Sequence, residues 1–181
     1  TQQVSSAASD VYKRQPRDIA AEAQLWMEEI ALEQATTERP VSVIRASNVQ
    51  GVPISGPPGN GLLHKWASEA PIGWVNVPGD GSDLKDFVHV QDLVECIMRV
   101  MADPPPTRES IAIGSGKGIQ LRDLAAIYNQ MTGCEAEYGQ NHDQEVFGIV
   151  DASEVEMRLG FRPTVSSVSY THLTLPTTPV V

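Results

Sequence analysis

The stretch GDGSDLKDFVHVQDL, residues 79–93, combines a tight turn, a short apolar run and the start of a helix. Gly79 and Gly81 suit a sharp reversal of the chain because glycine reaches positive φ values at little cost. The apolar positions of FVHV, residues 87–90, indicate a buried extended segment. Helical spacing begins near Gln91, so the stretch predicts a turn, a strand and a helix in immediate succession.

Three polar side chains in this stretch each have more than one interpretation on chemistry alone. Lys85 is either a solvated charge beside Asp83 and Asp86 or a cation directed at an anionic ligand. His89 alternates with valines, as a half-buried strand histidine with a satisfied hydrogen bond would. Asp92 stands in the first turn of the helix, where a carboxylate is favourable without any ligand.

The rest of the interior alternates helices with strands. Amphipathic spacing predicts helices over 18–36, 62–70, 91–102, 120–133 and 151–160, and apolar extended segments occupy 39–51, 72–77 and 110–116. The intervening stretch 52–61 holds three prolines and three glycines and is predicted to be a loop. This order predicts an α/β protein whose strands pair mainly in parallel.

The helical spacing also predicts which side chains share a face. The helix over 120–133 is expected to bury Leu121, Leu124, Ala125 and Tyr128, while one side of 18–36 carries Ile19, Ala23, Trp26 and Ile30, and one side of 91–102 carries Leu93, Ile97 and Met101. The last helix has an expected cap at Asp151 and an expected end at Gly160.

Composition excludes several classes of partner. The chain of 181 residues has 13 basic and 23 acidic residues, a formal net charge of −10, which argues against nucleic-acid phosphates and anionic membranes. No apolar run is long enough to span a membrane. Cys96 and Cys134 are far apart and lack a CxxC pattern, so we expect two reduced thiols in a cytoplasmic protein. The four histidines are scattered, and no metal site is predicted.

Two short segments are candidates for ligand contacts. RASN places Arg45 and Asn48 at the end of a strand, where open α/β sheets bind ligands, although both side chains could equally cap the loop that follows. GSGKG, residues 114–118, lacks the frame of a phosphate-binding loop, and a tight turn is the better interpretation.

Both ends of the chain differ in character from its interior. SSAASDVYKRQ (5–15) and SVSYTHLTLPTTPVV (167–181) show neither helical nor strand periodicity and resemble translated adapter sequence from environmental DNA. We therefore expect 1–15 and 166–181 to be non-native tails around a partial domain at 16–165.

Four motifs of the interior resemble, in order and spacing, the extended short-chain dehydrogenase/reductase family, and more narrowly its NAD-dependent epimerases and dehydratases. They are VSVIRASNVQG, GDGSDLKDFVHVQDLVECI, IAIGSGKGIQLRDLA and DASEVEMRLGFRP, across about 20–163. The resemblance implies the C-terminal half of a Rossmann-type parallel sheet plus the small sugar-nucleotide-binding subdomain. The nucleotide-binding half, with its glycine-rich turn, is expected to be missing.

The resemblance also implies roles for individual residues. Asn48 matches an asparagine beside the sugar nucleotide, and Ala46 matches the residue against the nicotinamide of NAD or NADP. Lys85 occupies the position of an arginine that binds the pyrophosphate; it keeps the charge but lacks the bidentate fork. A homodimer is implied for the intact parent, through the helix that carries Trp26 and Met27.

The catalytic pair of the family, Tyr-x-x-x-Lys, has no counterpart here. The aligned positions are Ala20 and Gln24, and a shifted register gives Arg14 and Asp18 instead. The leading interpretation is thus the substrate-binding part of a nucleotide-sugar epimerase/dehydratase, inactive by itself. The alternatives are a non-catalytic relative that binds a dinucleotide or sugar nucleotide, and an NADP-dependent carbonyl reductase of the same fold.

Overall fold

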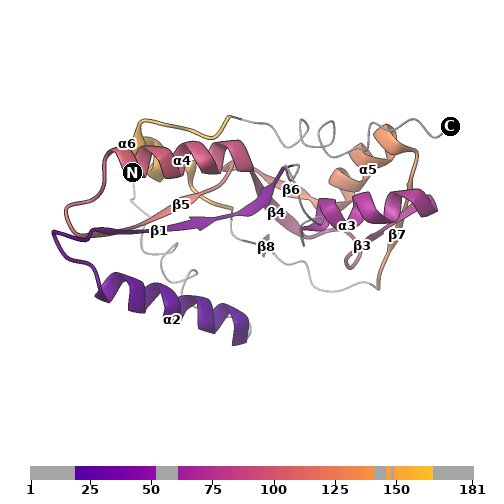
Figure 1. The fold of residues 1–181 in the computed structure, drawn as a ribbon. Helices are drawn as coiled ribbons and strands as arrows, with labels where there is room; N and C mark the ends of the chain where they lie inside the picture. Colours follow the sequence, from indigo (N-terminus) through magenta and orange to yellow (C-terminus); the bar gives the residue numbers. More distant parts are fainter. Residues whose placement is uncertain (1–18, 52–60, 141–145, 148, 165–181) are drawn as a thin grey trace, which may run out of the picture. The chain divides into compact units, whose positions relative to one another are not determined.

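The computed structural model describes residues 19–51, 61–140, 146–147 and 149–164 (Figure 1). The predicted tails at 1–15 and 166–181, and most of the predicted loop at 52–61, lie outside the described residues. The chain divides into two compact units. The first comprises 1–44 and 100–111, and the second comprises 45–99 and 112–181.

The first unit contains helix α2 (Ile19–Glu33), most of strand β1 (Val41–Ala46) and the first part of strand β5 (Arg108–Ile113). A turn joins α2 to β1 through backbone hydrogen bonds in both directions between Thr36 and Arg39. β1 and β5 form a two-stranded sheet, and Ser42 Oγ donates to Glu109 Oε1 at 2.8 Å. The helix predicted over 18–36 and the extended segment predicted from residue 39 are therefore present in this unit.

The second unit contains the remaining elements. They are β2 (Asn48–Gln50), α3 (Leu62–Glu69), the 3-10 turn η1 (Ala70–Ile72), β3 (Trp74–Val77), β4 (Leu84–His89), the larger part of α4 (Val90–Ala102), β6 (Gly118–Gln120), α5 (Leu121–Thr132), β7 (Glu135–Tyr138), β8 (Val146–Phe147) and α6 (Ala152–Leu159). Strands and helices alternate through most of it, as the sequence pattern predicts.

β4 is the central strand of the second unit. β2 pairs with its C-terminal half in parallel, β8 pairs with its N-terminal end in parallel, and β6 pairs antiparallel. A separate parallel pair is formed by β3 and β7. Among these four pairings only β4–β6 is antiparallel, so the predicted α/β class with mainly parallel pairing is confirmed.

The core of the second unit is formed mainly by side chains of α3, β3, β4 and α5. Its buried members are Leu63 and Trp66 of α3, Val75 and Val77 of β3, Phe87 of β4, Cys134, and Leu121, Leu124, Ala125 and Tyr128 of α5. All four residues predicted to be buried on the helix over 120–133 thus belong to it. The rings of Trp66 and Tyr128 meet edge to face, with centroids 5.6 Å apart, a favourable aromatic geometry.

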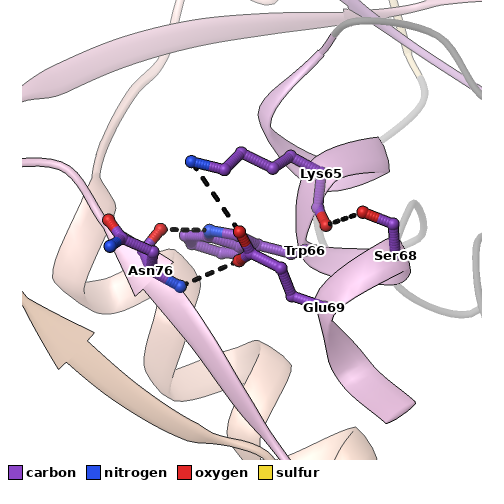
Figure 2. Close-up of polar contacts among 5 residues, drawn as sticks. All are labelled: Lys65, Trp66, Ser68, Glu69 and Asn76. Atoms are coloured by element: carbon purple, nitrogen blue, oxygen red, sulfur yellow. Dashed lines mark hydrogen bonds and ion pairs between the residues drawn. The ribbon is translucent and has the colours of Figure 1, made fainter. Parts of the chain in front are cut away.

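Side chains of α3 hold one edge of β3 (Figure 2). Trp66 Nε1 donates to the carbonyl of Asn76 at 2.8 Å, and the N–H of Asn76 donates to Glu69 Oε2 at 2.9 Å. Lys65 Nζ lies 3.7 Å from Glu69 Oε1. Both backbone groups of Asn76 are therefore bonded to α3 side chains, which fixes the helix against the strand.

The capping signals of α6 are confirmed. Asp151 Oδ1 accepts a hydrogen bond from the N–H of Ser153 at 2.9 Å, and this bond lowers the pKa of Asp151. Gly160 ends the helix in the left-handed region, with φ 60°. Arg99 of α4 donates to the carbonyl of Leu159 at 3.1 Å and lies over the ring of Phe161, which joins α4 to the end of α6.

One sequence expectation needs correction. The segment 39–51 is not one strand: it bends at Ser47 and forms β1 and β2 in different sheets, because Ser47 N–H still bonds Ile113 while Asn48 already pairs with β4. The apolar sides that helical spacing predicts for α2 and α4 are largely exposed in this chain. The exposed fractions are 60% for Trp26, 59% for Ile30, 39% for Ile97 and 70% for Met101.

Tyr128 generates a stability prediction. Its hydroxyl is buried and has no hydrogen-bond partner among the described residues. Burial, with smaller effects of Cys134 and Glu69, raises the pKa of Tyr128 to about 12. We expect Tyr128→Phe to raise the free energy of unfolding by about 1 kcal/mol at neutral pH, because it removes an unsatisfied buried group.

The same change should alter the alkaline behaviour. The unfolded tyrosine ionises near its ordinary pKa of 10.0, before the folded one, so wild-type stability should fall as pH rises from 10 to about 12. In Tyr128→Phe this fall in stability with pH should be absent, because phenylalanine has no group that ionises. Urea unfolding at several pH values measures both effects, with the exposed Tyr138→Phe as the control; a loss of stability in Tyr128→Phe would contradict the prediction.

Candidate functional site

The residues predicted to bind substrate lie on one face of the β2–β4 pair. Neighbours paired in register share a face, and alternate residues along a strand return to it. The register pairs Asn48 with Phe87 and Gln50 with His89, and Lys85 lies two residues before Phe87. Asn48, Gln50, Lys85 and His89 therefore form a polar set, which we call the β2–β4 face.

Strand geometry places the two predicted substrate-binding residues close together. A rise of about 3.3 Å per residue and a spacing of about 4.8 Å between strands put the Cα atoms of Asn48 and Lys85 roughly 8 Å apart. Asn48 is exposed, and its Nδ2 donates to the carbonyl of Asp86 at 2.8 Å. Lys85 is half-buried. An amide and an ammonium at this separation could contact neighbouring groups of one anionic ligand.

The other face of β4 carries Asp86, a residue whose role the sequence did not reveal. Its side chain is fully buried and accepts hydrogen bonds from two parts of the chain. Oδ1 accepts from the N–H and the hydroxyl of Ser115, at 2.9 and 2.5 Å. Oδ2 accepts from the N–H groups of Gly116 and Val150, at 3.2 and 3.1 Å.

This arrangement explains the glycine-rich turn at 114–118. The consecutive N–H groups of Ser115 and Gly116, the latter with φ +73°, form a concave donor pair of the kind that binds anions. The anion here is the carboxylate of Asp86. A Cβ on Gly114 would collide with Asp86 Oδ2 and with the side chain of Val150. The preference for a structural turn over a phosphate-binding loop agrees with this geometry.

The glycine turn before β4 holds the beginning of α5. The N–H groups of Leu121 and Arg122 donate to the carbonyls of Asp83 and Gly81, at 3.0 and 2.9 Å. Gly81 has φ +76°, and a Cβ there would lie 2.9 Å from Arg122 and Tyr138 atoms. The turn therefore requires glycine for both conformation and space, and it anchors β4 against the core helix.

The other two candidate residues within 79–93, His89 and Asp92, have mainly structural contacts. His89 is buried, and its Nδ1 accepts from the N–H of Gln91 at 3.2 Å, so it caps the start of α4. Asp92 is buried in the first turn of α4 and accepts from the N–H of Thr164 at 3.4 Å. The structural interpretation of both residues is favoured over a ligand contact.

The predicted cofactor contact lies on β1, and the two positions that align with Tyr-x-x-x-Lys lie on α2. Ala46 is the last residue of β1 and is exposed, and Arg45 precedes it half-buried. Ala20 and Gln24 are one turn apart on α2, and Gln24 is exposed. Neither residue at the Tyr-x-x-x-Lys positions can exchange a proton as a phenol does.

In the described part of the chain, no group of three His, Cys, Asp or Glu side chains could hold a metal ion. In the same part of the chain no helix is long and apolar enough to cross a membrane.

Comparison with known proteins identifies the family. The sequence model of the NAD dependent epimerase/dehydratase family matches residues 3–114, more than half of the chain, so the chain belongs to this family. The resemblance inferred from the four motifs is thereby confirmed.

Individual relatives support the same class. GDP-L-fucose synthase 1 of Arabidopsis thaliana is 33% identical over 95 residues, 51% of this chain and 29% of that protein. The dTDP-L-rhamnose 4-epimerase of Burkholderia thailandensis is 27% identical over 140 residues, 70% of this chain and 36% of that protein. The chain thus spans about a third of the length of these relatives.

A solved structure has the same fold. UDP-glucose 4-epimerase from Bifidobacterium longum, in complex with NAD+ and UDP, superimposes with a TM-score of 0.70 at 19% identity, covering 86% of this chain and 52% of that one. The predicted Rossmann-type α/β class is confirmed by this similarity together with the parallel strand pairs.

The buried carboxylate of Asp86 leads to a stability prediction. Asp86→Asn should lower the free energy of unfolding by about 3 kcal/mol, because an amide donor would face backbone donors that the buried carboxylate now satisfies. Urea denaturation measures the change. The exposed Asp123→Asn, in the first turn of α5, is the matched control and should cost at most about 0.5 kcal/mol. Equal effects of the two substitutions would contradict the assigned role.

Proposed function

We propose that this chain supplies the nucleotide-sugar-binding part of a cytoplasmic NAD(P)-dependent epimerase/dehydratase. The observation that carries the proposal is the placement of Asn48 and Lys85 on one face of the β2–β4 pair, roughly 8 Å apart between Cα atoms by strand geometry. Family membership and the UDP bound to the Bifidobacterium longum epimerase support this class of ligand.

Each residue has a distinct task in this proposal. Lys85 binds the diphosphate as a point charge, which attracts phosphate oxygens without fixing their orientation. Asn48 is already held by Asp86, and its exposed amide contacts the ligand beside the diphosphate. The net negative charge of the chain does not oppose this, because one placed cation suffices for a small anion.

NAD or NADP belongs to the same proposal. Ala46 ends β1 with an exposed methyl group, and so small a side chain leaves space for a flat ring, which fits a nicotinamide. The bound cofactor would supply hydride exchange with a sugar carbon. The chain's own part is to hold the sugar nucleotide in position. The segment 16–165 is the proposed family domain, and α2, with Trp26 and Met27 exposed, is the proposed contact of a homodimer.

A second function is favoured by the residues on α2. Ala20 and Gln24 stand where the family has tyrosine and lysine, so a relative that binds its ligand without catalysis is the competing proposal. Sequencing the natural gene across Gln15/Pro16 and Val165/Ser166 separates the two. A tyrosine and lysine pair in the natural frame supports the severed enzyme, and an unbroken frame with Ala20 and Gln24 supports the binding protein.

The binding proposal generates a direct prediction. UDP-glucose, GDP-mannose and dTDP-glucose are titrated into the chain by calorimetry, and we expect one of them to bind. Lys85→Met should then weaken binding about tenfold or more, because a charge-assisted contact contributes about 1.5–3 kcal/mol. Lys85→Arg should restore affinity, since it restores the cation and adds a bidentate fork.

The exposed Lys117→Met is the matched control and should leave affinity unchanged. Absence of binding for all three sugar nucleotides would overturn the proposed function.

A further inference from the structure

The glycine-rich turn at 114–118 is connected to the candidate binding site through one residue, Asp86. Ser115 donates its N–H and its hydroxyl to Asp86 Oδ1, and Gly116 donates its N–H to Oδ2. The backbone carbonyl of the same aspartate accepts a hydrogen bond from Asn48 Nδ2 at 2.8 Å. Two hydrogen bonds, both made by Asp86, therefore link the hydroxyl of Ser115 to the amide that the proposed function assigns to the ligand.

The carbonyl of Asp86 sets the orientation of the Asn48 amide. A carbonyl oxygen only accepts hydrogen bonds, so the amide must present its nitrogen to it. This leaves the amide oxygen and the second N–H of Asn48 for a ligand, and the residue is exposed. A shift or rotation of the Asp86 carbonyl would redirect both of these groups at once.

The carboxylate of Asp86 opposes such a movement. It is fully buried and accepts hydrogen bonds from two separate segments, the turn at 114–118 and the N–H of Val150. The turn leads into β6 and Val150 follows β8, and both strands pair with β4 within residues 84–86. Hydrogen bonds to a charged group are the strong ones, and a rotation of Asp86 would break several of them together. The carboxylate therefore holds the peptide group to which Asn48 is bonded.

We propose that Asp86 is a positioning residue for the nucleotide sugar, which acts by orienting Asn48, and that Ser115 acts on the ligand through Asp86. Neither side chain touches the ligand: the carboxylate is fully buried and is bonded to the chain itself. The role rests on the proposed function, because its effect is measured on the ligand that Asn48 contacts. It gives the turn at 114–118 a part in binding without any phosphate contact of its own.

A double-mutant cycle in the full chain tests this connection. UDP-glucose, GDP-mannose and dTDP-glucose are titrated into the wild-type chain by calorimetry, and the one that binds most tightly becomes the probe. Ser115→Ala removes the hydroxyl bonded to Asp86 and should weaken binding about threefold or more, a coupling common within one hydrogen-bond network. Asn48→Ala should weaken binding as well. In the Asn48→Ala background, Ser115→Ala should have no further effect, because the amide that it helps to orient is absent.

Asp151→Ala is the control for a general loss of stability. It removes the N-cap of α6 and should lower the melting temperature, but its side chain has no part in the bonds between Ser115 and Asn48. Its affinity for the probe should therefore equal that of the wild-type chain. Melting temperatures of all variants, recorded on the same samples, establish that each is folded at the temperature of the titration.

The results that would overturn the positioning role differ in what they say about the function. If the wild-type chain binds a probe, the role is wrong when Ser115→Ala leaves affinity unchanged, when it weakens binding equally with and without Asn48, or when Asp151→Ala weakens binding as much. Asp86 and the turn are then structural only, and the proposed function stands. If the wild-type chain binds none of the three probes, the proposed function is overturned and the positioning role with it.

Discussion

The carboxylate of Asp86 connects three parts of the second unit that are distant in sequence. The two carboxylate oxygens accept hydrogen bonds from the turn after β5 and from the segment that enters α6. The backbone carbonyl of Asp86 accepts a hydrogen bond from the side-chain amide of Asn48. Hydrogen bonds to a charged group are the strong ones, and a buried charge is tolerated only when it is satisfied in this way. The side chain of Asp86 therefore holds both the turn and the entry to α6, and the backbone carbonyl of the same residue holds Asn48 of β2.

The two faces of β4 carry different side chains. Asp86 and Val88 point to one face and are fully buried, whereas Lys85, Phe87 and His89 point to the other. On that second face Phe87 belongs to the core, and the polar residues lie beside it along the strand. A strand covered on both faces is rigid, so the backbone of Lys85 is fixed while its flexible side chain can still change rotamer.

Sequence patterns predicted the local elements well and the long-range contacts poorly. Helical spacing identified α5 and its four buried residues, because that face repeats with the period of a helix. The short strands β6, β7 and β8 were not predicted. β6 and β8 have three residues or fewer, and the four residues of β7, EAEY, are too few for a pattern and include Glu and Ala, which are depleted in strands. The structural role of Asp86 had no signal in the sequence, because its partners Ser115, Gly116 and Val150 come near it only in the folded chain.

The bonds from α3 to Asn76 determine how far the β3–β7 sheet can extend. In a parallel pair, alternate residues of a strand bond to the neighbour, and the residues between them point their N–H and C=O groups outward. At Asn76 both outward groups are taken by Glu69 and Trp66. An additional strand, whether from another molecule or from an aggregating copy, would first have to break these bonds and displace a fully buried tryptophan, so this edge of the sheet is protected against β-augmentation.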